Sequence, residues 1–170
     1  MTFSIYQASV PVYVRRLEAL SAIIDKAAAF AAVRKIVHSV LLQARLFPDM
    51  LPLAVQVQIA CGHAMRGAAR LSGGEPTVFE GEAISLDDLK VRISKTLEVI
   101  RNIDAKKMDG MEDREITFPV GDRKETMKGS DYLLNFSMPN FYFHLTTAYD
   151  ILRHNGVEIG KDDFMGAAKQ

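Results

Sequence analysis

One segment, residues 130–155, constrains the fold of this chain more than any other, because it reads as a single long helix with three faces. When each residue is placed about 100° after the one before, apolar side chains fall in one arc, and Thr146, Asp150 and Arg153 lie roughly opposite. A helix with such an arc needs other helices to cover it, so the segment predicts a helical bundle. The arc consists of Leu134, Met138, Phe141, Leu145, Ala148, Tyr149 and Leu152.

The third face of this helix carries small polar groups and one imidazole. This face, called the polar stripe below, consists of Ser137, Asn140, His144 and Thr147. Pro139 lacks the N–H that would bond to the Asn135 carbonyl, so we expect a kink there and a carbonyl without its helical partner. Asn140 and His144 are one turn apart and can address the same ligand or water. We therefore expect the polar stripe to face an interior or half-interior polar space.

Three further helices are expected upstream. The first begins at a capping box of Ser4 and Gln7 and keeps helical spacing as far as Ile24. A connection rich in alanine and charge should follow it, and then a short helical turn near His38. The second long helix is predicted over about residues 52–71, ended by the glycines at 73 and 74. The third begins after Ser85 and carries one clean apolar stripe as far as residue 103.

Between the third and last helices the pattern changes to two short strand-like runs, 115–119 and 124–127, around a turn signal at 120–123. This pattern predicts a small β-hairpin. The expected fold class is therefore all-α, an antiparallel four-helix bundle with a hairpin inserted before the last long helix. We expect a single domain over residues 1–170.

Composition limits the partners. Lys+Arg and Asp+Glu both number 21 and neither sign forms a long run, so we expect no nucleic acid and no anionic membrane as partner. No stretch approaches the ~20 apolar residues of a membrane span, and the beginning of the chain lacks a signal-peptide pattern. The lone Cys61 cannot form an internal disulfide and fits a reducing compartment. These features predict a cytoplasmic protein.

Several motifs together resemble a known family. They are PNFYFH at 139–144, TTAYDILRHNGV at 146–157, PDM at 48–50 and QVQIA at 56–60. Across essentially the whole chain, the sequence is similar to the bacterial family called domain of unknown function 1993. The resemblance implies a DinB/YfiT-like four-helix bundle, a group with many dimers. Many members hold a metal through one histidine on the second helix and a His-x-x-x-His pair on the last, a spacing that Asn140 and His144 occupy here.

The candidate site residues leave three interpretations open. The second helix offers Gln56, His63 and Arg70 along one stripe, so His63 and His144 could face each other and hold a divalent transition metal with water. Alternatively, His144 is a hydrogen-bonded histidine at the edge of the core and His63 is exposed. In the third interpretation the same side chains bind a small molecule. The ligand-binding candidates are His144, Asn140, Ser137, Thr147, Gln56 and His63, and the metal candidate is His144.

Other catalytic patterns are missing from the sequence. It has no Glu-x-x-His motif, no Gly-x-Ser-x-Gly elbow and no glycine-rich phosphate loop. Two classes of function remain: a dimeric scaffold or small-ligand-binding protein with a polar site around His144, and a DinB-like metal-dependent enzyme of the thiol-dependent transferase or hydrolase type.

We also expect a homodimer. The chain is 48% apolar, and Phe136 and Phe143 lie outside the main apolar arc of the last helix. The tail after residue 157 contains Ile159 and Phe164, which should pack onto the bundle or onto a second subunit.

Overall fold

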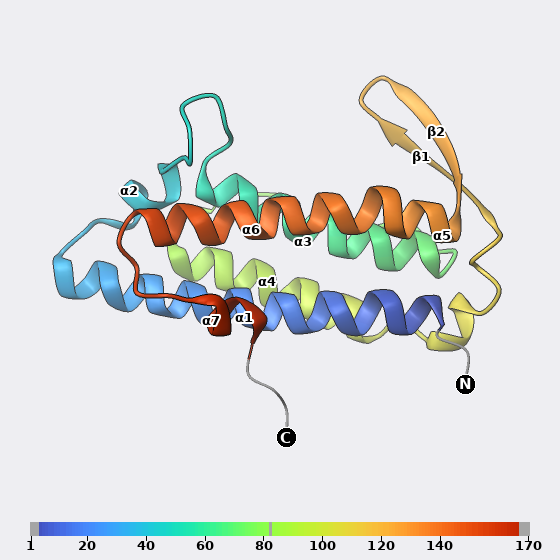
Figure 1. Ribbon diagram of the computed structural model, residues 1–170, viewed down its shortest axis with the longest axis horizontal. Coiled ribbons are helices and arrows are strands. Elements are labelled where there is room, and N and C mark those ends of the chain that lie inside the picture. The colour runs from blue at the N-terminus through green and yellow to red at the C-terminus, as the bar shows by residue number, and fades with distance from the viewer. Residues whose placement is uncertain (1–3, 82, 167–170) are drawn as a thin grey trace.

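The computed structural model describes residues 4–81 and 83–166, which form two layers of two long helices with a hairpin at one end (Figure 1). The long helices are α1 (Ile5–Arg34), α3 (Leu53–Leu71), α4 (Leu86–Arg101) and α6 (Met138–His154). The shorter elements are α2 (His38–Gln43), η1 (Ala105–Met108), β1 (Glu115–Val120), β2 (Arg123–Lys128), α5 (Gly129–Asp131), η2 (Tyr132–Ser137) and α7 (Lys161–Met165). The predicted four-helix bundle with an inserted hairpin is confirmed.

Each layer is an antiparallel pair, α3 with α6 and α1 with α4 (Figure 1). α3 and α4 also pack against each other, and they run in the same direction (Figure 1). None of the described helices combines the length and the apolar content that crossing a membrane requires.

The predicted helix starts at Ser4 and Ser85 are confirmed, and the structure has a capping box at each. The Ser4 Oγ accepts from the Gln7 backbone N–H at 3.2 Å, and the Gln7 Oε1 accepts from the Ser4 N–H at 3.1 Å. Ser85 and Asp88 make the same reciprocal pair at the start of α4. Because each box satisfies backbone donors that have no partner within the helix, it fixes where the helix begins.

The first helix is longer than predicted. The alanine-rich stretch expected to be a connection continues α1 to Arg34, and Ala27 and Ala31 are fully buried within it. Alanine is the best helix former, and its small side chain lets a neighbouring element approach closely. The helix ends only at Lys35, whose φ of 54° is left-handed. The expectation of a connection after Ile24 is therefore wrong.

The core lies between the two layers and includes one apolar face of α3. Six apolar residues on this face are buried. They are Leu53, Val57, Ala60, Ala64, Ala68 and Leu71. Cys61 also lies in this core, where burial raises the pKa of its thiol to about 11 and keeps it protonated.

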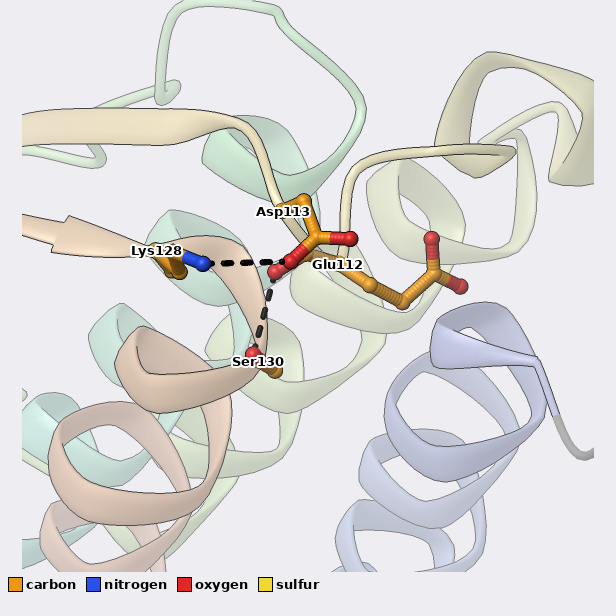
Figure 2. A network of polar contacts seen from close by, with 4 residues as sticks. All are labelled: Glu112, Asp113, Lys128 and Ser130. Carbon is orange, nitrogen blue, oxygen red and sulfur yellow. Dashed lines mark hydrogen bonds and ion pairs between the residues drawn. The ribbon is translucent and has the colours of Figure 1, made fainter.

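The hairpin leads directly into α5, the short turn before η2 and α6, through a tight contact at Gly129. A Cβ on Gly129 would lie 1.8 Å from the Met111 carbonyl oxygen, so only glycine fits there. Figure 2 shows the contacts beside it, where Lys128 pairs with Asp113 at 3.4 Å and the Ser130 hydroxyl donates to the Glu112 carbonyl at 3.0 Å. The Lys128 pair is exposed and contributes little stability. The close backbone approach is what places the hairpin beside the start of α6.

The tail packs back onto the bundle of its own chain. Phe164 of α7 meets the Tyr149 ring edge-on at 5.6 Å, and Ile159 is buried. Arg16 of α1 donates to the Phe164 carbonyl at 2.9 Å and to the Met165 carbonyl at 2.7 Å. Residues 167–170 of the predicted tail lie outside the described residues.

Candidate functional site

The helix that carries the polar stripe begins with a wide turn. Tyr132–Ser137 is a π-helical turn, in which the Met138 N–H donates to the carbonyl of Leu133, five residues earlier. A π turn holds one residue more than an α turn, so it rotates the preceding residues by about 100° relative to α6. As a result Tyr132 and Leu133 are buried and Leu134 is 63% exposed. The prediction that Leu134 belongs to the apolar arc is therefore wrong.

Pro139 lies in the first turn of α6, immediately after the π turn. The Asn140 side chain donates from Nδ2 to the Phe136 carbonyl at 2.7 Å. This bond satisfies a backbone acceptor of the irregular turn. The Asn140 amide thus bonds to the turn before its own helix, and no hydrogen bond between Asn140 and His144 is present among the described residues.

Two members of the polar stripe are buried in the core and make internal hydrogen bonds. The Ser137 Oγ lies 2.8 Å from the Tyr13 hydroxyl, in a fully buried pair that links the last residue of η2 to α1. Thr147 donates from Oγ1 to the Phe143 carbonyl of its own helix at 2.7 Å. Because both hydroxyls have partners, Ser137 and Thr147 contribute to packing and helix register.

His144 meets α3 through a short chain of hydrogen bonds. The His144 Nδ1 lies 2.7 Å from the Gln56 Oε1, and the Gln56 Nε2 donates to the Leu51 carbonyl at 3.0 Å. Gln56 is buried, and its amide nitrogen is already committed as a donor, so its oxygen must accept from His144. The proton of the neutral imidazole is therefore on Nδ1, and Nε2 carries the lone pair.

His63 of α3 completes the contact with α6. The His63 and His144 ring planes are nearly parallel, at 12°, with centroids 5.9 Å apart, and the Phe136 ring lies 6.1 Å from His63. Both histidines are half-buried, so the interpretation that His63 is exposed does not hold. Burial, then the positive charge of Arg66, lowers the pKa of His63 to about 3, and the same two causes lower the pKa of His144. Both imidazoles are therefore neutral near pH 7.

Two arginines of α3 lie beside these histidines. Arg66 and Arg70 follow His63 by three and seven residues and so share its side of the helix. Arg70 donates to the Tyr132 hydroxyl at 3.1 Å and lies over the rings of Phe118 and Tyr132. Arg66 was missed by the sequence reasoning, although its helical spacing from His63 was the available signal.

The donor set does not fit a transition metal. The described residues contain no group of three or more histidine, cysteine, aspartate or glutamate side chains placed to hold a metal ion. The cluster offers two imidazoles and one amide, and the guanidinium of Arg66 beside them opposes a second positive charge. Metal-dependent chemistry therefore gains no support from these residues.

The fold and the site together define a four-helix bundle with a neutral, arginine-flanked histidine pair between its second and last long helices. A crystal structure of a DinB family member protein from Shewanella denitrificans matches with a TM-score of 0.90 and 37% identity, covering 97% of this chain and 93% of that chain. The family model of the domain of unknown function DUF1993 matches residues 5–165, so this chain belongs to the DUF1993 family. Among curated proteins, none matches this chain significantly.

Proposed function

We propose that this chain is a small-molecule-binding bundle whose site lies at the seam between α3 and α6, around His144. The observation that carries the proposal is the chain from His144 through Gln56 to the Leu51 carbonyl. It fixes one tautomer and leaves Nε2 as an acceptor to which no described residue hydrogen-bonds. A buried side chain that orients an imidazole in this way is typical of a site that receives a donor from a bound molecule.

Of the six candidate residues, four lie at this seam, and they have different roles in the proposed site. His144, Gln56 and His63 come together across the seam. Asn140 is half-buried next to them but donates to its own helix. The proposed ligand contacts are therefore His144 and His63, with Gln56 as the residue that positions His144.

A comparison of two histidine variants tests this location. A metabolite library is screened by ligand-observed NMR against the wild-type chain, His144→Gln and His154→Gln. His154 is exposed in the last turn of α6 and serves as the matched control. Compounds that bind the wild type and His154→Gln but not His144→Gln are expected. Hits that bind all three proteins equally would place the ligand elsewhere and refute the proposed site.

We also propose that the chain forms a homodimer in solution. Phe143 of α6 is 56% exposed, and large apolar side chains are also exposed near the start of α3, at Phe47 and Leu51. Exposed aromatic side chains of this size favour an interface with a partner. Phe136, the second residue behind the dimer expectation, instead packs within the chain, 4.6 Å from the Phe118 ring of the hairpin. Phe143 is thus the stronger candidate for the interface.

A cytoplasmic location is the third part of the proposal. Its support is the single cysteine, Cys61, which is buried and protonated in the core. A chain stabilised by its helical core, with no disulfide among the described residues, suits a reducing compartment.

A further inference from the structure

We propose that the ligand of this site carries an oxyanion, a carboxylate or a phosphate, which the guanidinium of Arg66 binds beside His63 and His144. This inference rests on the proposed small-molecule site and names the chemical class of its ligand. It starts from the unbalanced charge of the group His63, Arg66, Arg70 and His144, called the basic cluster below.

Among the described residues, no acidic side chain pairs with the basic cluster. The chain as a whole has equal numbers of acidic and basic residues, yet the ion pairs of the described residues all lie elsewhere. Arg70 bonds to a tyrosine, and His144 bonds to an amide. Half-buried guanidinium groups in proteins are normally paired with a carboxylate or phosphate, so a half-buried arginine with no acid beside it indicates that the anion comes from outside.

The two arginines differ in how they are held. Arg70 is fixed by the Tyr132 hydroxyl at 3.1 Å and by the faces of Phe118 and Tyr132, at 5.2 and 5.8 Å from its guanidinium carbon. These contacts bond one nitrogen of the guanidinium and place the group over two aromatic rings. Arg70 therefore supports the hairpin and adds positive charge, while a ligand contact is not required of it.

Arg66, in contrast, makes no hydrogen bond or ion pair among the described residues. Its guanidinium lies back over Gly62, where a Cβ would be 2.8 Å from Nη1 and 3.2 Å from Nη2. The missing side chain at Gly62 lets the guanidinium lie against the helix surface, with its N–H groups unpaired. The planar fork of arginine matches the two oxygens of a carboxylate or phosphate.

Electrostatics agrees with this geometry. Burial and then the charge of Arg70 lower the pKa of Arg66, and the charge of Arg66 contributes to the low pKa of both histidines. A bound anion would relieve the repulsion within the basic cluster. Neutral His144, with its free Nε2, then accepts a hydrogen bond from a donor group of the same ligand, such as a hydroxyl next to the anion.

Histidine NMR tests the inference directly. The chain has four histidines, so their ring signals report the site at His63 and His144 and provide internal controls at His38 and His154. Sodium phosphate or sodium acetate replaces sodium chloride at constant ionic strength and pH. We expect a saturable shift of the His63 and His144 signals only. The stronger of the two probes distinguishes a phosphate-bearing from a carboxylate-bearing ligand.

Two matched variants locate the anion. Arg66→Gln removes the guanidinium and should weaken the binding of the probe about tenfold or more, since a charge-assisted hydrogen bond is lost. Arg15→Gln removes an exposed arginine of α1 and should leave binding unchanged. Thermal unfolding of each variant confirms that it is folded, and Arg66→Lys, which keeps the charge, should bind more tightly than Arg66→Gln.

The results separate this inference from the proposed site. Saturable shifts that are lost in Arg66→Gln support the oxyanion. If neither probe moves His63 or His144, or if Arg66→Gln responds like the wild type, the oxyanion inference is overturned. A neutral library compound that needs His144 but not Arg66 would overturn the oxyanion inference and leave the proposed site standing.

Discussion

Gly67 should be intolerant of the smallest substitution, Gly67→Ala, because of the contact between three helices beneath the site. A Cβ at this position of α3 would lie 2.6 Å from the Ser137 Oγ and 2.6 Å from the Tyr13 hydroxyl oxygen. These two oxygens are themselves hydrogen-bonded at 2.8 Å and fully buried. The methyl group would therefore push apart two buried hydroxyls that have no other hydrogen-bond partner among the described residues.

The change in the free energy of unfolding is the difference between a gain in helix propensity and a loss in packing. Alanine favours the helix by about 1 kcal/mol relative to glycine. Overpacking a well-filled core costs about 1–3 kcal/mol, and separating the buried hydroxyl pair costs about 1–3 kcal/mol more. The net expectation is a loss of roughly 1–5 kcal/mol in the free energy of unfolding, so packing outweighs helix propensity.

Gly62→Ala is the matched control in the same helix. The three atoms nearest to its Cβ all belong to the end of the flexible Arg66 side chain, which can move away. The helix propensity term should then dominate, and the variant should be as stable as the wild type or more stable by up to about 1 kcal/mol. Urea unfolding followed by circular dichroism measures both variants.

Two results would refute this reasoning about close packing. One is a Gly67→Ala protein at least as stable as the wild type. Removing the Ser137 hydroxyl should relieve part of the clash. The other refuting result is therefore that Gly67→Ala lowers the free energy of unfolding by the same amount in a Ser137→Ala background as in the wild type. A double-mutant cycle over the two positions gives the coupling directly.

Three further predictions concern the site and the interface. The folded-state pKa of His63, about 3, lies below its unfolded value of 6.5, so the unfolded state binds more protons between these values; stability should fall as pH drops from about 6.5 toward 3. Urea titrations at pH 7 and pH 5 should show that the free energy of unfolding falls less in His63→Asn than in the wild type. An equal fall in both proteins would contradict the low pKa of His63. Gln56→Leu should destabilise the chain by about 1–3 kcal/mol and alter the ¹⁵N shifts that report the His144 tautomer, because the Leu51 carbonyl and the His144 Nδ1 lose their partner; unchanged shifts would show that Gln56 does not set the tautomer. Phe143→Ser should shift the chain from dimer to monomer in light scattering, whereas a wild-type chain that is already monomeric at high micromolar concentration would remove the basis of the dimer proposal.

Local signals explain the parts of the fold that the sequence predicted well. Ser4 with Gln7 and Ser85 with Asp88 lie three residues apart and satisfy backbone donors within one turn, so each box can be recognised without knowing the rest of the chain. Gly73, with φ of 72°, ends α3 for the same kind of local reason.

Two errors arose where no local signal decides. The alanine-rich stretch after Ile24 has little apolar pattern of its own, yet α1 continues because Ala27 and Ala31 fill narrow space against neighbouring elements. The π turn before α6 is likewise invisible to a constant 100° step, since one extra residue in a turn leaves the composition unchanged. It exchanged Leu134 for Leu133 in the core.

In the candidate site, too, some features could be predicted from local spacing and others could not. The spacing within α6 was enough to single out His144, and the spacing within α3 placed Gln56 and His63 on one face of that helix. That Gln56 fixes the His144 tautomer, and that Arg66 lies unpaired beside both histidines, depends on how α3 and α6 pack together. Periodicity fixes the direction of a side chain around its own helix axis, whereas the rotation and offset between two helices come from the packing of the whole core, which only the tertiary structure decided.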